Sequence, residues 1–305
     1  MSLIFSQVII GCCCNVILLE NLILNSESSI GTLVTFSQFL FVSLVSYPSN
    51  MKGTSLKSLY LAPRVPPSKW FLMVIMYFST SLMNNLVWKF NISIPMHIVF
   101  RSGSTAITML VGYMFGKRYS TRQIVSSITI SLGILLVSLP DDLSFDHDMD
   151  YHYLIGIMIL FAASVISAFM GIYNEFVFKQ YGTSWEESLF YTHFLGLPFF
   201  LTVAPLLRKE WLILWNLPAF LKQLVNLGLN VATQFVCARG VNMLAEKTSA
   251  LTVTIVLLVR KLISLMISFV WFGNEISFRS AVGIGIVGIG VVGYSTGGRR
   301  KKEKE

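Results

Sequence analysis

Apolar runs of about twenty residues alternate along the chain with short polar connectors. Ten such runs cover 3–24, 30–48, 69–90, 93–116, 121–139, 153–178, 186–206, 218–239, 249–272 and 278–296. An α-helix rises about 1.5 Å per residue, so roughly 20 residues are needed to cross about 30 Å of hydrocarbon. The pattern therefore predicts an all-α membrane protein with ten transmembrane helices.

Composition agrees with this assignment, and the placement of charge orients the helices. Hydrophobic residues make up 54% of the 305 positions and charged residues only 12%, about half the share typical of soluble domains. With the N-terminus in the cytosol, fifteen of the 23 lysines and arginines fall on the cytosolic side and five on the opposite side. Since cytosolic loops are enriched in these residues, both termini are expected to be cytosolic. The net charge of +8 therefore reflects topology, and no nucleic-acid partner is predicted.

A weak internal repeat divides the ten runs into two halves. An offset of 157 residues aligns Gly116 with Gly273, Ser120 with Ser277, Arg122 with Arg279, Gly133 with Gly290 and Ser138 with Ser295. Because five is an odd number, the second copy would enter the membrane from the other side, a construction known in secondary transporters. We expect two inverted five-helix repeats at 1–139 and 153–296, a lumenal connector at 140–152 and a cytosolic basic tail at 297–305.

The cysteines and histidines predict neither a disulfide framework nor a metal site. Cys12, Cys13 and Cys14 lie in the first run and Cys237 in the eighth, where small apolar packing residues are expected. The histidines have no partners at metal-ligand spacing. No cofactor is predicted.

Three cations lie well inside the apolar runs, away from the run ends where the other lysines and arginines occur: Arg101, Arg260 and Lys261. A charge at the centre of a membrane helix costs at least about 2.5–3.5 kcal/mol, so it calls for a functional explanation. Glu20 and Glu175, the acids that could neutralise them, lie near the ends of their runs. An anionic ligand could supply the missing countercharge. Alternatively, the cations reach the headgroups or bond to backbone carbonyls.

Further polar side chains occur at similar depth and complete the set of candidate ligand-binding residues. They are Asn84, Asn85, His97, Tyr191, His193, Gln38 and Gln234. Amides and a tyrosine suit nucleobase edges and sugar hydroxyls, while guanidinium and ammonium groups suit phosphate. Each residue alone serves equally well as a hydrogen-bonding link between helices.

Two parts of the sequence carry a fairly specific pattern: the segment from Asn84 and Asn85 through Asn91 to Ser104, and the ninth-run segments Ala250–Thr254 and Leu258–Leu265. Weaker patterns extend over Gly11–Val16, Thr35–Phe41 and Leu189–His193. Together these segments resemble the nucleotide-sugar transporters, most closely the branch that carries UDP-N-acetylglucosamine and in some animals UDP-xylose.

This resemblance implies the drug/metabolite transporter fold and the exchange of a cytosolic UDP-sugar for lumenal UMP across the Golgi or endoplasmic reticulum membrane. It also implies that a basic pair, Arg260 and Lys261, binds phosphate. UDP-xylose or another phosphate-bearing metabolite remains an alternative substrate. A membrane-embedded enzyme is disfavoured, since no catalytic constellation is evident. Glycine-rich helix faces serve packing within and between chains alike, so a homodimer stays open.

Overall fold

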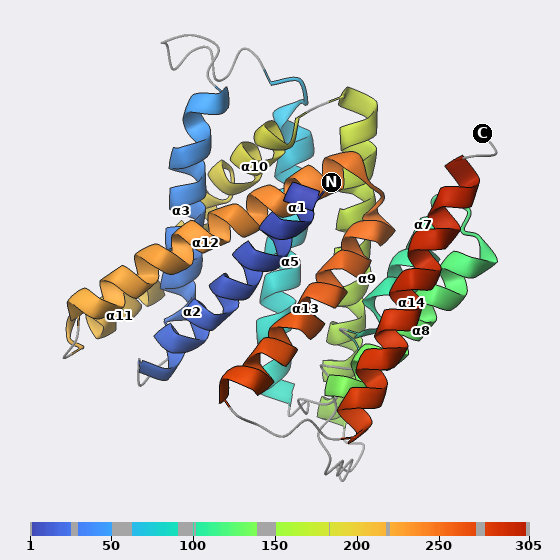
Figure 1. Ribbon diagram of the computed structural model, residues 1–305. Helices are drawn as coiled ribbons and strands as arrows, with labels where there is room; N and C mark the ends of the chain where they lie inside the picture. Colours follow the sequence, from blue (N-terminus) through green and yellow to red (C-terminus); the bar gives the residue numbers. More distant parts are fainter. Residues whose placement is uncertain are drawn as a thin grey trace. The chain divides into compact units, whose positions relative to one another are not determined.

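The computed structural model is helical throughout the part of the chain that it describes (Figure 1). It describes residues 2–25, 30–50, 63–90, 100, 102–138, 151–182, 184–217, 220–272 and 278–302, and no β-strand occurs in these ranges. Residues 140–150 of the connector expected at 140–152, and the last three residues of the basic tail, lie outside the described residues.

The first part of the chain contains α1 (Ser2–Ser6), the π-helix η1 (Gln7–Gly11), α2 (Cys12–Asn25), α3 (Gly31–Asn50), α5 (Pro67–Leu86), the 3₁₀-helix η2 (Val87–Phe90), α7 (Ser104–Met114) and α8 (Thr121–Ser138). The second part contains α9 (Tyr151–Tyr181), α10 (Trp185–Phe194), the 3₁₀-helix η3 (Leu197–Val203), α11 (Ala204–Trp215), α12 (Phe220–Lys247), α13 (Ala250–Phe272) and α14 (Phe278–Lys302).

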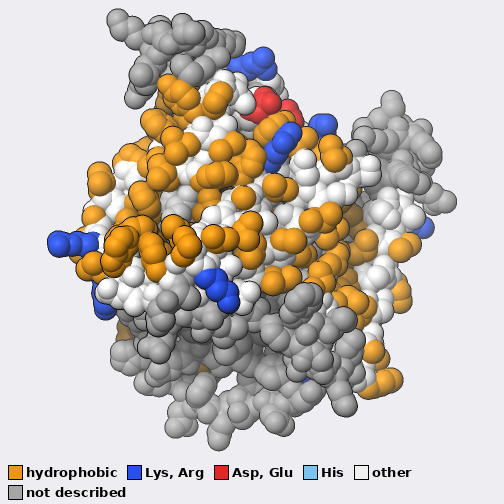
Figure 2. All heavy atoms as spheres, turned by 60° about the vertical axis from the view of Figure 1, so that its left-hand side comes forward, with side chains coloured by type: hydrophobic (Ala, Val, Ile, Leu, Met, Phe, Trp, Pro, Cys, Tyr) orange, Lys and Arg blue, Asp and Glu red, His pale blue; other side chains and the backbone are white. Residues whose placement is uncertain are grey.

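The helices have the length and surface of membrane spans. Within the described ranges, five stretches are long and apolar enough to cross a bilayer: Ser2–Leu19, Gly31–Asn50, Tyr153–Tyr181, Trp185–Trp215 and Phe278–Thr296. Large apolar side chains such as Leu201 and Ile289 are more than 70% exposed, and Figure 2 shows hydrophobic side chains over much of the described surface. Lipid is the solvent that such a surface requires. The all-α membrane class is confirmed, and the count of ten spans stays a prediction.

Proline explains why one predicted span is not a single helix. The run expected at 186–206 is divided into α10, η3 and α11, with Pro198 at the start of η3 and Pro205 at the start of α11. Proline has no N–H for the helical ladder and is favoured in the first turn of a helix. The helical stretch continues to Trp215, nine residues past the expected end.

The residues group into two compact units, each with helices from both parts of the chain. The first unit comprises Met1–Val74 and Glu175–Thr248, and the second comprises Ile75–Asn174 and Ser249–Glu305.

In the first unit, the N-terminal helices pack closely against α12. A side-chain carbon added at Gly11 would lie 2.8 Å from the Cys237 backbone nitrogen, and one at Gly240 would lie 3.0 Å from that of Val8. Glycine therefore permits the two backbones to approach. At this crossing Cys12 and Cys237 form a disulfide with a Cα–Cα distance of 4.7 Å. The prediction that all four cysteines serve only as packing residues is wrong for this pair, because helix packing joins positions 225 residues apart.

In the second unit, α8 and α14 run antiparallel in close contact (Figure 1). A side-chain carbon added at Gly133 would lie 2.9 Å from the Gly283 carbonyl oxygen and 2.9 Å from the Val287 nitrogen. One added at Gly290 would lie 3.1 Å from the Ser126 carbonyl oxygen and 3.1 Å from the Ile130 nitrogen. Backbone meets backbone at both glycines, so any side chain there would push the helices apart.

Candidate substrate-binding site

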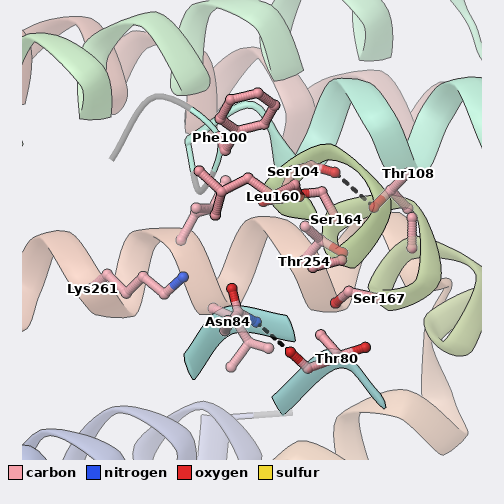
Figure 3. A pocket seen from close by; sticks show the side chains of 14 residues that line it. Thr80, Asn84, Phe100, Ser104, Thr108, Leu160, Ser164, Ser167, Thr254 and Lys261 are labelled. Carbon is pink, nitrogen blue, oxygen red and sulfur yellow. Dashed lines mark hydrogen bonds between the residues drawn. The ribbon is translucent and has the colours of Figure 1, made fainter. Parts of the chain in front are cut away.

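A cavity of about 290 Å³ lies within the second unit, between α5, α7, α9 and α13 (Figure 3). Its lining is Thr80, Asn84, Phe100, Ser104, Thr108, Leu160, Ala163, Ser164, Ser167, Ala168, Thr254, Leu257, Leu258 and Lys261. One ammonium, one amide, six hydroxyls and an aromatic ring thus share one hollow.

Helical spacing brings Lys261 into the cavity. Thr254, Leu258 and Lys261 follow one another at intervals of four and three residues, which places them on one face of α13. Figure 3 shows the Lys261 ammonium extending toward the part of the cavity where Asn84 lies. Thr254 lies two turns away along the same helix, a rise of about 10 Å at 1.5 Å per residue.

The cavity walls carry charge of one sign only. Lys261 is the single charged side chain among the described lining residues, and none of them is a carboxylate. Glu175, which could have offset the cations, lies in the first unit and pairs with Lys179 at 2.6 Å, one turn along α9. A cation in a low-dielectric hollow favours an anionic ligand, because the anion offsets the cost of burying the charge.

Four of the six hydroxyl groups that line the cavity direct their hydrogens into their own helices. Thr80, Thr108, Ser164 and Thr254 each donate to the carbonyl four residues earlier, at 2.8 to 2.9 Å. A serine or threonine hydroxyl has one hydrogen and two acceptor lone pairs. Once the hydrogen is used in the helix, the oxygen remains as an acceptor for a ligand.

Asn84 is constrained in the same manner. Its Nδ2 donates to the Thr80 carbonyl oxygen at 2.9 Å (Figure 3). This bond orients the amide at the cavity wall, and the Oδ1 oxygen remains an acceptor.

Of the predicted ligand-binding residues, Lys261 and Asn84 line this cavity. Arg260 does not, since adjacent helix residues point about 100° apart; its side chain is half-buried elsewhere on α13. His97 and Arg101 lie outside the described residues, and so does the side chain of Asn85.

The other four candidates belong to the first unit, where three of them have visible packing roles. Gln38 Nε2 donates to Asn230 Oδ1 at 2.8 Å, a link between α3 and α12. The His193 ring lies 4.8 Å from that of Phe39, and its Nδ1 lies 2.7 Å from the Leu189 carbonyl oxygen. Tyr191 is 8% exposed and packs edge-on against Phe190. Gln234 is half-buried on α12. None of the four lines the cavity of the second unit.

The hydroxyl-bearing residues of the cavity were missed by sequence reasoning. For the two serines of α9 the sequence shows a run of small side chains, in which Ala163, Ser164, Ser167 and Ala168 share a face; the hydroxyl residues on the other helices show no comparable pattern. Such a run is more often read as a helix-packing surface. Within the described ranges, no group of three His, Cys, Asp or Glu side chains could hold a metal ion.

Comparison with known proteins decides the class to which this site belongs. The model of the UAA transporter family matches residues 1–298. The chain belongs to the UAA transporter family. The cavity is therefore part of a membrane transporter, and the alternative of a membrane-embedded enzyme is set aside.

Curated relatives of this UAA family member carry transporter names. It is 35% identical to the UDP-N-acetylglucosamine transporter YEA4 of Saccharomyces cerevisiae, over 99% of this chain and 96% of the relative. It is 40% identical to the UDP-N-acetylglucosamine transporter yea4 of Schizosaccharomyces pombe, over 87% and 85%. It is 34% identical to the endoplasmic reticulum GDP-fucose transporter of Drosophila melanogaster, over 90% and 84%.

A solved crystal structure shares the fold of this UAA family member. Its TM-score is 0.66 with 14% sequence identity, covering 97% of this chain and 98% of the other. At that identity the likeness concerns the fold alone.

Proposed function

We propose that this transporter carries UDP-N-acetylglucosamine from the cytosol into the lumen of the Golgi apparatus or endoplasmic reticulum, in exchange for UMP. The observation that carries the proposal is Lys261 at the wall of a polar cavity with no carboxylate among its described lining residues. The choice of N-acetylglucosamine as the sugar comes from the names of relatives at 35% and 40% identity. Lys261 would contact phosphate, a group that substrate and exchange partner share.

UDP-N-acetylglucosamine and UMP both bring phosphate, which an ammonium binds through charge-assisted hydrogen bonds. Either ligand would thereby stabilise the cavity as water is expelled from it. The carrier would therefore pass between its two open states more readily with a nucleotide bound in either direction. UDP-sugar would enter the lumen and UMP would return.

The α8–α14 contact supports the inverted five-helix repeats that alternating access requires. The 157-residue offset carries Gly133 to Gly290, Ser126 to Gly283 and Ile130 to Val287. The backbone atoms that face Gly133 belong to Gly283 and Val287, and those that face Gly290 belong to the matching residues, Ser126 and Ile130. Two antiparallel helices that exchange their contacts in this manner are expected at a pseudo-twofold axis in the membrane plane.

Orientation and location belong to the same proposal. The excess of lysine and arginine on one side supports cytosolic termini. One relative is named for the endoplasmic reticulum. The proposal covers both the Golgi apparatus and the endoplasmic reticulum. A homodimer stays open.

Transport in reconstituted liposomes tests this function. Purified protein should take up labelled UDP-N-acetylglucosamine when the vesicles are preloaded with UMP. Uptake of equal rate without UMP would contradict obligatory exchange, and no uptake of any UDP-sugar would contradict the substrate class.

Lys261→Ala should lower the exchange rate by at least about tenfold, since a charged hydrogen bond to phosphate is lost. Lys222→Ala, at an exposed lysine of α12, is the control and should keep the normal rate. Normal exchange by a correctly folded Lys261→Ala protein would contradict the role of the cavity.

A competition assay is needed for two reasons. One relative is named for GDP-fucose, and the resemblance implies UDP-xylose as an alternative substrate. Unlabelled UDP-N-acetylglucosamine, UDP-xylose and GDP-fucose would compete with the labelled sugar. We expect UDP-N-acetylglucosamine to compete best; stronger competition by GDP-fucose would reassign the base specificity.

A further inference from the structure

The cavity of the second unit has two chemically different ends. Lys261 and Asn84 occupy one part, whereas Thr108, Ser164 and Thr254 occupy another (Figure 3). Because Thr254 is two helical turns from Lys261, about 10 Å along α13, the two ends must contact different parts of one ligand.

We propose that Thr108, Ser164 and Thr254 form a sugar-recognition wall, which binds the pyranose of the UDP-sugar while Lys261 binds its phosphate. The inference rests on the proposed function and deepens it by naming the residues that distinguish the sugar.

Hydrogen-bond direction favours the sugar over the base at this wall. The hydroxyls of Thr108, Ser164 and Thr254 come from α7, α9 and α13, and each donates its hydrogen to its own helix. The wall consequently presents acceptors. Uracil would meet it with two carbonyl oxygens around a single N–H, and acceptor would face acceptor. A pyranose carries several O–H donors, and N-acetylglucosamine adds an amide N–H, so donors meet acceptors throughout.

The volume of the cavity supports the same division into a phosphate end and a sugar end. A volume of about 290 Å³ is at the lower limit for sites that enclose a whole drug-sized ligand. The cavity is therefore matched to part of a nucleotide sugar. Ala163 and Ala168 stand beside Ser164 on α9, and their small side chains keep the wall open to a ring.

UMP provides the discriminating experiment, because it has the uridine and phosphate of the substrate but no sugar. Ser164→Ala and Thr254→Val remove one hydroxyl each with little change of shape. In reconstituted liposomes each variant should raise the KM for UDP-N-acetylglucosamine by roughly threefold to tenfold, the effect of one lost hydrogen bond. The KM for UMP in UMP–UMP exchange should stay within a factor of two.

Thr129→Val is the matched control. Thr129 also donates to the carbonyl four residues earlier, Val125, but it lies partly exposed on α8 and does not line the cavity. Its removal should leave both KM values unchanged. Thermal shift in detergent gives a second readout, since a ligand stabilises the protein in proportion to the logarithm of its affinity. The wall variants should show a smaller Tm rise with UDP-N-acetylglucosamine and an unaltered rise with UMP.

Two results would contradict the proposed sugar-recognition wall. One is an equal loss of affinity for UMP and for the UDP-sugar, which would assign these hydroxyls to the shared part of the ligand. The other is normal UDP-sugar affinity in the double variant Ser164→Ala/Thr254→Val. If the unmodified protein exchanges neither ligand, the proposed function itself fails; if it exchanges both and the variants behave normally, only the wall fails.

Discussion

At the scale of single residues, buried carboxylates accept hydrogen bonds from backbone N–H groups where helices begin, inside the first turn of α3 and just before α5. Glu210 on α11 is 3% exposed, and its Oε2 accepts a 2.7 Å hydrogen bond from the Leu33 backbone N–H in the first turn of α3. The first N–H groups of a helix have no partner within it, and negative charge is favourable there. Glu187 likewise accepts from the Val65 N–H at 3.0 Å, just before α5. These acids stabilise the fold and have no part in the cavity.

Glu210→Ala should therefore destabilise the protein without altering substrate specificity. The loss of a buried charged acceptor leaves the Leu33 N–H unsatisfied and costs on the order of 1–3 kcal/mol. The measurement is the thermal midpoint in detergent, with Lys209→Ala at the neighbouring exposed position as control. A Glu210→Ala protein as stable as the control would contradict a stabilising role for this hydrogen bond.

At the scale of elements, glycine determines how closely α8 and α14 approach. Gly133 and Gly290 have backbone atoms of the facing helix about 3 Å from where a side chain would begin, whereas Gly285 and Gly288 have open space. Replacing a glycine of α14 should therefore lower the stability of the protein at Gly290 but not at Gly285 or Gly288.

Gly133→Ala and Gly290→Ala should each lower stability by about 1–3 kcal/mol, the usual cost of overpacking. Gly288→Ala should be neutral or slightly stabilising, since alanine favours the helix and meets nothing. Melting of the four proteins in one detergent compares them directly. Equal midpoints for Gly133→Ala and Gly288→Ala would mean that the close packing contributes nothing.

The apolar pattern predicted where these helices occur but not all of their ends. α8 and α9 agree with the runs 121–139 and 153–178 to within a few residues, because hydrophobic length is set by the bilayer. α12 continues to Lys247, eight residues past the expected end. Its last turns mix polar and charged residues such as Arg239, Asn242 and Glu246 with buried Leu244 and Ala245, so a search for continuous apolar runs ends before the helix does.

At the scale of the whole molecule, the sequence identified the class of the protein and the cation that lines its candidate site, and the structure supplied the other lining residues. Lys261 could be found because a cation in an apolar run is conspicuous. Ser164 and Thr254 could not, since hydroxyl residues that bond to their own helix are common in membrane spans and carry no distinctive pattern. The pairing of Cys12 with Cys237 was equally hidden, because distance along the chain says nothing about distance in space.

The Cys12–Cys237 bond makes most of the polypeptide a closed ring. Residues between these cysteines, 225 positions apart, are joined to one another by two covalent routes. A protease site inserted in the connector at 140–150 can therefore be cut without separating the pieces. On a denaturing gel the cut protein should remain one species without reductant and give two bands with dithiothreitol, and Cys237→Ala should give two bands under both conditions. The bond would be disproved by two bands from the unmodified protein without reductant. A single cleavage between the two cysteines therefore leaves the carrier covalently whole.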